Sequence, residues 1–152
     1  MNEALQSAAG YLEPYGARIG LQPTTQALDP RPFLIGLLEQ LATSCLASGA
    51  SVIGHLKCLL RTPEGVLGCN LTSVRSGASC AARAGGEVPR ALPPGMRATL
   101  DLTVLVYGLP ANTIDALLHE TLAALLDPLA VSWSAGGPCG GSDQTIGSSM
   151  AR

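Results

Sequence analysis

Aromatic and charged residues are scarce in this chain of 152 residues. Aromatic residues make up 3% of it and charged residues 13%, and Lys57 is the only lysine. Hydrophobic residues reach 47%, so a core can form, but it must consist mainly of Leu, Val, Ile and Ala. A surface so poor in charge hides its apolar patches badly, which favours a protein partner or self-association. A biased genomic base composition explains the same enrichment in Ala, Gly and Arg equally well.

What is missing also disfavours several functions. The formal net charge is −2, whereas proteins that bind phosphate backbones usually carry a basic excess, so nucleic-acid binding is disfavoured. The longest apolar stretch, 114–126, contains Asp115, His119 and Glu120 and is too short to cross a bilayer. The first ten residues lack the basic cluster and apolar run of a secretory signal. We therefore expect a cytoplasmic protein without membrane contact.

The five cysteines form no CxxC pair. In a reducing compartment we expect all of them to be free thiols. Cys45, Cys58 and Cys69 fall on inward-facing positions of predicted elements, where thiols are inert. Cys80 and Cys139 fall in predicted flexible segments and are open to redox chemistry, but neither has a zinc ligand at the usual spacing. We predict no metal site, and no cofactor is indicated.

Hydrophobic periodicity predicts one α+β domain over residues 29–133. Two helices would cover one face of a small antiparallel sheet, made of a β-hairpin and a third strand, in the order α-β-β-β-α. Asp29 and Pro30 suit a helix start, and Gly49 suits a helix end. The predicted elements are helices over 30–48 and 112–126 and strands over 51–61, 66–74 and 96–107.

Two signals conflict over the register of the hairpin. The turn chemistry around Gly65 favours a bulge, which would shift the pairing by one residue. We favour the hydrophobic match, because a slip of one residue would expose a whole apolar row. That match pairs Leu56 with Leu71, Cys58 with Cys69, and Leu60 with Leu67.

The remaining segments are predicted to be irregular. Residues 1–28 are interpreted as an N-terminal arm, a short helix broken by Pro14, Gly16, Gly20 and Pro23. Residues 75–95 are a long loop, a length that is usually functional or mobile. A short extra strand is possible at 129–133, and residues 134–152 form a flexible Gly/Ser-rich tail.

The predicted order of elements resembles that of double-stranded-RNA-binding domains. Such domains carry a basic cluster at the start of the last helix. Here that segment, 112–115, reads Asn-Thr-Ile-Asp and holds no Lys or Arg. The loop between the second and third strands is also too long, so we do not assign the chain to that family.

The candidate binding surface is the outward face of the predicted sheet. A face that alternates polar and apolar residues is also what solvent exposure alone produces. Four aliphatic residues on the same face, Ile53, Leu59, Val66 and Leu105, favour pairing with a second subunit. An acid–base pair of His55 and Asp101 is the first place to look for catalysis. The candidate binding residues are His55, Lys57, Arg61, Asn70, Thr72 and Asp101.

Three functions remain open, and no catalytic constellation is evident. The leading hypothesis is a non-enzymatic accessory or assembly protein that acts through protein–protein contacts and self-associates. The second is a regulatory domain that binds a small ligand or cofactor between the outer sheet face and the 75–95 loop, where His55, Lys57 and Arg83 or Arg90 would meet an anion. The third is an RNA-binding module, which predicts strongly salt-dependent binding.

Overall fold

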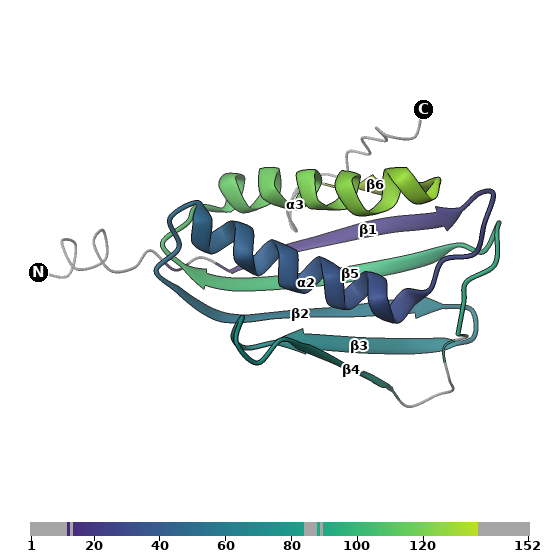
Figure 1. Cartoon of the computed structure of the whole chain (residues 1–152), viewed down its shortest axis with the longest axis horizontal. Coiled ribbons are helices and arrows are strands. Elements are labelled where there is room, and N and C mark those ends of the chain that lie inside the picture. Colours follow the sequence, from purple (N-terminus) through teal and green to yellow (C-terminus); the bar gives the residue numbers. More distant parts are fainter. Residues whose placement is uncertain (1–11, 13, 84–87, 89, 137–152) are drawn as a thin grey trace, which may run out of the picture.

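Six antiparallel strands form one sheet, and two helices pack against one of its faces in the computed structural model (Figure 1). The structure describes residue 12, residues 14–83, residue 88 and residues 90–136. The strands lie in the order β4-β3-β2-β5-β1-β6. Along the chain the elements are β1 (Tyr15–Pro23), α2 (Pro30–Ala47), β2 (Val52–Thr62), β3 (Gly65–Leu71), β4 (Ala78–Ala82), β5 (Ala98–Tyr107), α3 (Ala111–Leu126), a 3₁₀ turn (Asp127–Leu129) and β6 (Val131–Ala135).

The α+β class is confirmed, but the predicted three-stranded sheet and the α-β-β-β-α order are wrong. The observed order is β-α-β-β-β-β-α-β, so the likeness to double-stranded-RNA-binding domains disappears with it. The largest error is β1, which was assigned to an irregular arm. This strand alternates strictly, burying Tyr15, Ala17, Ile19 and Leu21, and it lies between β5 and β6. Its glycines sit on the other face, where the strand tolerates them.

The predicted 75–95 loop contains a second unexpected strand, β4. It pairs with β3 and forms one edge of the sheet, with Cys80 directly opposite Cys69. These two cysteines form a disulfide, a bond that persists in oxidising compartments. The expectation of free thiols is therefore wrong for both residues, and so is the placement of Cys80 in a flexible segment. Cys139 lies outside the described residues.

The hairpin register follows the hydrophobic match. Leu56 pairs with Leu71, Cys58 with Cys69, and Leu60 with Leu67, as predicted, and all six side chains are buried. The irregularity lies instead between Ile53 and His55 on the β5 side of β2. A Cβ on Gly54 would come within 2.8 Å of the Leu105 carbonyl oxygen, so glycine permits this close approach. Ile53 consequently turns toward the core opposite Val106, and the prediction that it faces outward is wrong.

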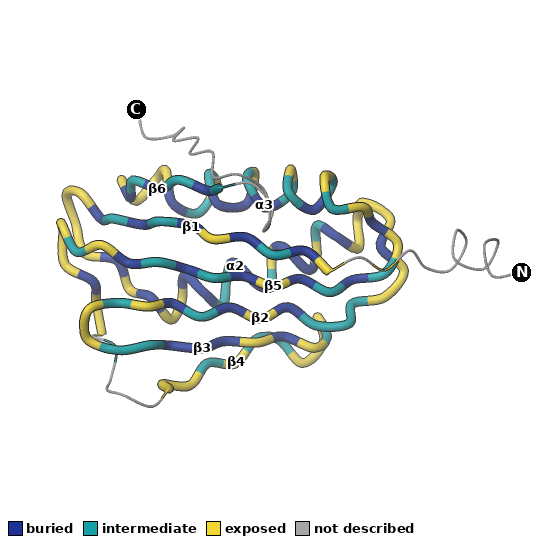
Figure 2. The backbone as a smooth tube through the Cα atoms, turned by 180° about the vertical axis from the view of Figure 1, so that it is seen from behind, coloured by how far each residue is buried: buried dark blue, intermediate teal, exposed yellow. Residues whose placement is uncertain are grey.

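Both helices cover the same face of the sheet. Seen from behind, the strands lie in front of both helices, and nothing in the described part of the chain covers them (Figure 2). Helix α2 starts after Asp29, although the Asp29 side chain makes no capping hydrogen bond. Helix α3 starts after Pro110 rather than at Asn112. The core between the layers is aliphatic, as predicted, and no described helix is long and apolar enough to span a bilayer.

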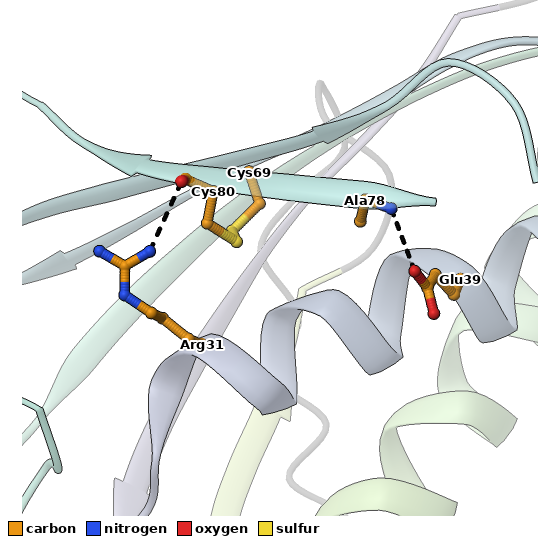
Figure 3. Close-up of a disulfide and its surroundings, with 5 residues drawn as sticks. All are labelled: Arg31, Glu39, Cys69, Ala78 and Cys80. Carbon is orange, nitrogen blue, oxygen red and sulfur yellow. Dashed lines mark hydrogen bonds between the residues drawn. A yellow bond between two sulfur atoms is a disulfide. The ribbon is translucent and has the colours of Figure 1, made fainter. Parts of the chain in front are cut away.

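Helix α2 also protects the open edge of β4. Cys80 and Cys69 form a non-hydrogen-bonded pair of the antiparallel ladder, with 4.0 Å between their Cα atoms. The backbone N–H and C=O of Cys80 therefore point away from β3. The carboxylate of Glu39 accepts a hydrogen bond of 3.0 Å from the Ala78 N–H, and Arg31 donates one of 3.5 Å to the Cys80 carbonyl (Figure 3). An exposed edge strand without charges or proline invites pairing with other chains. These two side chains occupy part of that edge.

Candidate functional site

The uncovered side of the sheet, here called the open face, carries most of the basic side chains in the protein. Its outward positions alternate with buried ones along β1, β5 and β6, and along β2 from Leu56 to Arg61. Five of the nine Lys and Arg residues lie on its strands or one residue beyond a strand end. By the same count Asp101 on β5 and Glu64, one residue before β3, are acidic, which leaves a formal net charge of +3. The basic residues are Arg18, Lys57, Arg61, Arg83 and Arg97.

The helical side of the molecule has the opposite charge. Its two helices and their ends carry five acidic residues and one arginine, a formal net charge of −4. The overall charge of −2 therefore conceals two faces of opposite sign. Net charge alone is a poor guide to binding when the fold segregates charges in this way, because the local potential steers a partner. The residues on the helical side are Asp29, Arg31, Glu39, Asp115, Glu120 and Asp127.

Asp101 organises the centre of the open face. Its two carboxylate oxygens accept hydrogen bonds from Arg18 Nε at 2.7 Å and from Arg61 Nε at 3.0 Å. Partial burial raises the pKa of Asp101, but the hydrogen bonds and charges of the two arginines outweigh burial and leave the pKa below its usual value. The side chain of Arg18 is 71% exposed, that of Arg61 is 51% exposed and that of Asp101 is 25% exposed. Ion pairs this exposed to solvent add little to the stability of the fold. Their main effect is to fix two guanidinium groups on the sheet.

Arg83 extends the basic surface toward β4. A Cβ on Gly68 would lie 2.7 Å from Arg83 Nε and 3.2 Å from a methyl group of Leu59, so Arg83 lies flat over Gly68 beside an aliphatic side chain. Leu59, Val66 and Leu105 are half-buried on this face, as predicted. Val52 is 53% exposed, because the irregularity at Gly54 shifts the register at this end of β2. The open face thus combines aliphatic and basic residues.

The structure brings most of the predicted site residues together. His55, Lys57 and Arg61 project from the outward side of β2, Asn70 lies opposite Lys57 on β3, and Asp101 is on β5. Thr72 is exposed just beyond the end of β3. The proposed pair of His55 and Asp101 is not formed. His55 lies opposite Leu105, four residues from Asp101 along β5, which is about 13 Å, and both Asp101 oxygens already bind arginine.

Sequence reasoning missed the arginines at the two ends of this surface. Arg18 was hidden because β1 was interpreted as irregular, and Arg83 because β4 was interpreted as loop. The strict alternation of Tyr15, Ala17, Ile19 and Leu21 was the available signal for β1. No comparable signal existed for β4, whose sequence is Ala-Ser-Cys-Ala-Ala.

A second polar cluster joins α3 to the sheet, and its contacts are structural. The Tyr15 hydroxyl donates to the Asp115 carboxylate at 2.5 Å, and Trp133 Nε1 donates to Asp127 Oδ1 at 3.0 Å. His119 on α3 is half-buried, and the centroid of its ring lies 5.9 Å from that of Trp133. In the described part of the chain, no group of three His, Cys, Asp or Glu residues could hold a metal.

The two described free cysteines are inert core residues, as predicted. Burial raises the pKa of Cys45 to about 11. Burial also raises the pKa of Cys58 to about 12, although a hydrogen bond from the Cys69 backbone opposes the shift. A thiol with such a pKa is almost entirely protonated at neutral pH and is a poor nucleophile.

No family model matches this sequence, and no curated protein is similar to it. The function proposed below is therefore inferred from the open face itself.

Proposed function

We propose that this protein is a non-enzymatic accessory protein whose open face binds an acidic protein partner. The single observation that carries the proposal is the segregation of charge, with a formal +3 on the uncovered face of a protein whose net charge is −2. Complementary charge accelerates association and selects among partners. The half-buried aliphatic residues Leu59, Val66 and Leu105 lie among the basic residues and supply the apolar contact that a protein interface needs.

The mixture of side chains favours a protein over a nucleic acid. Proteins that bind single strands without sequence preference stack bases on aromatic side chains, whereas Tyr107 is the only aromatic residue among the outward positions of the described strands. The charge also favours a different protein over a second copy of this chain. A sheet-to-sheet homodimer would bring two faces of +3 together, and like charges across an interface are costly.

Fluorescence anisotropy tests the proposal with two labelled probes. One is a 15-residue peptide of alternating Leu and Glu, and the other is a 15-nucleotide oligo(U). We expect the peptide to bind more tightly than the oligonucleotide at physiological salt, and its affinity to fall as salt rises. Tighter binding of oligo(U) would replace the proposal with RNA binding. Light scattering on the same sample detects self-association, and a dimer that buries the open face would also contradict the proposal.

Two variants with the same net charge separate local from global electrostatics. Lys57→Glu/Arg83→Glu reverses two charges on the open face, whereas Arg75→Glu/Arg90→Glu reverses two exposed charges outside it. Arg75 lies two residues before Gly77, which faces Glu39 on α2, and Arg90 lies beside the start of α2. Both control charges therefore lie near the helical side of the molecule. We expect the first variant to lose about tenfold in peptide affinity, since each reversed contact contributes somewhat under 1 kcal/mol, and the second to lose less than twofold. Equal losses would mean that the peptide senses only net charge.

A further inference from the structure

A shallow hollow opens on the open face where β5, β1 and β6 run side by side. Its volume is about 380 Å³. Gly20 lies between Thr99 on β5 and Ser134 on β6 in the same row of the sheet. Since neighbouring strands are about 4.8 Å apart, the missing side chain leaves a gap roughly 10 Å wide between the Thr99 and Ser134 backbones. The outward-facing lining residues are Gly20, Gln22, Arg97, Thr99, Ser132 and Ser134.

The hollow is lined by hydrogen-bond donors. Thr99, Ser132 and Ser134 contribute hydroxyl groups from two strands, and Arg97 contributes a guanidinium. Among the residues that the structure describes, no hydrogen bond engages these three hydroxyls. Gln22 is fixed at the rim, because its side-chain amide donates to the Gly95 carbonyl oxygen at 3.1 Å.

The surroundings of the hollow are positively charged. Arg61 is the cross-strand neighbour of Thr99, and Arg18 is two residues before Gly20 on the same side of β1. Asp101 holds both of these arginines in place. With Arg97, three basic residues and one acidic residue leave a local charge of +2. The Asp101 contact uses one of the five N–H donors of Arg61.

This combination fits a phosphate monoester better than a carboxylate. A phosphate monoester carries a charge of −1.5 to −2 at neutral pH and three strong acceptor oxygens, which match a local charge of +2 and three hydroxyl donors. We infer that the hollow is a binding site for a phosphate group, and that this group is a phosphorylated side chain of the acidic partner. The inference deepens the proposed function and rests on it for the identity of the ligand.

Three forms of one peptide test the inference with the full chain. An acidic peptide carries Ser, Glu or phosphoserine at its centre, and inorganic phosphate is the fourth ligand. We expect the phosphoserine form to bind at least about tenfold more tightly than the Ser form, and the Glu form to gain much less. Equal affinities of the phosphoserine and Glu forms would overturn the inference. If inorganic phosphate bound as tightly as the phosphoserine peptide, the site would belong to a free small phosphate and the assignment to a partner side chain would be wrong.

Filling the hollow is the decisive variant. A Cβ at Gly20 would meet only Ser134 Oγ, at an ordinary 3.5 Å, and β-branched residues suit strands, so Gly20→Val is compatible with the fold. We expect it to abolish the difference in affinity between the phosphoserine and Ser peptides, whatever it does to the affinity for the Ser peptide itself. Ser79→Val, at an exposed outward position of β4, is the matched control and should keep the gain. A full gain in Gly20→Val would refute the site.

Amide NMR shifts separate failure of the site from failure of the proposed function. If no peptide binds but inorganic phosphate shifts the Gly20, Thr99 and Ser134 amides saturably, the hollow binds phosphate and the acidic partner is wrong. If the Ser peptide binds and phosphate shifts spread over the whole open face without saturation, the acidic partner stands and the hollow is not a site.

Discussion

Opening the Cys69–Cys80 disulfide should lower the stability of the protein by an amount that follows from its position. The two cysteines are 11 residues apart in sequence. Restricting a loop of that length in the unfolded chain stabilises the folded state by about 2.8 kcal/mol at 25 °C in the chain-entropy description. For a protein of this size, such a loss corresponds to a fall in melting temperature of roughly 6–11 °C. Reduction also releases the edge strand β4, whose other ties are its pairing with β3 and the contacts of Arg31 and Glu39.

The assay is thermal unfolding followed by circular dichroism, with and without a phosphine reductant. The double variant Cys69→Ala/Cys80→Ala is the control, and its melting temperature should not respond to the reductant. Alkylation of the unfolded, unreduced protein should label two cysteines fewer than alkylation after reduction. A melting temperature that is the same with and without reductant, together with full labelling before reduction, would show that the reasoning is wrong.

Two further perturbations test the fold and its electrostatics. Gly54→Ala should destabilise the protein by about 1–3 kcal/mol, because its Cβ would lie 2.8 Å from the Leu105 carbonyl oxygen. Gly36→Ala in the middle of α2 should instead stabilise it by about 0.5–1 kcal/mol, because the nearest atom to the new Cβ is 3.9 Å away. Urea unfolding measures both free energies, and effects of the same sign would contradict the geometry. The pKa of Asp101 is lower in the folded state, so its stabilising effect is present above the ordinary carboxyl pKa of about 3.9 and is lost as the pH falls through the lower folded value. Asp101→Asn should therefore reduce the loss of unfolding free energy that occurs below pH 4. If the variant loses as much unfolding free energy below pH 4 as the natural protein, the arginine contacts do not persist in solution.

Elements whose apolar residues recur at regular spacing could be predicted from the sequence. Helix α2, helix α3, the hairpin and β5 were all predicted, because their apolar residues recur at helical or strand spacing over 7 or more residues. The hairpin register was also predictable, since burial of Leu56, Leu60 and Cys58 outweighed the turn preference at Gly65. Strand β6 was anticipated two residues too early, at 129–133 instead of Val131–Ala135.

The missed elements have physical reasons. Strand β1 has a strict alternation, but Gly16, Gly20 and Pro23 are typical of loops and masked it. Strand β4 consists of small residues that give no contrast between its two faces, so only its pairing with β3 defines it. These two errors removed two of the six strands from the predicted sheet, and with them Arg18 and Arg83 from the predicted site. The basic character of the open face became visible only when all six strands were in place.

The most direct test of whether the open face binds an acidic partner is to locate the bound peptide by NMR. Backbone amide shifts of the full chain are recorded while the alternating Leu and Glu peptide is added. We expect shifts at outward positions of the central strands, at Lys57, Leu59 and Asp101, and little change in the helices. An apolar groove between the start of α2 and the end of α3, lined in part by Phe33 and Leu125, is the alternative docking place. Shifts confined to that groove, with the open face unchanged, would show that the open face does not bind the peptide.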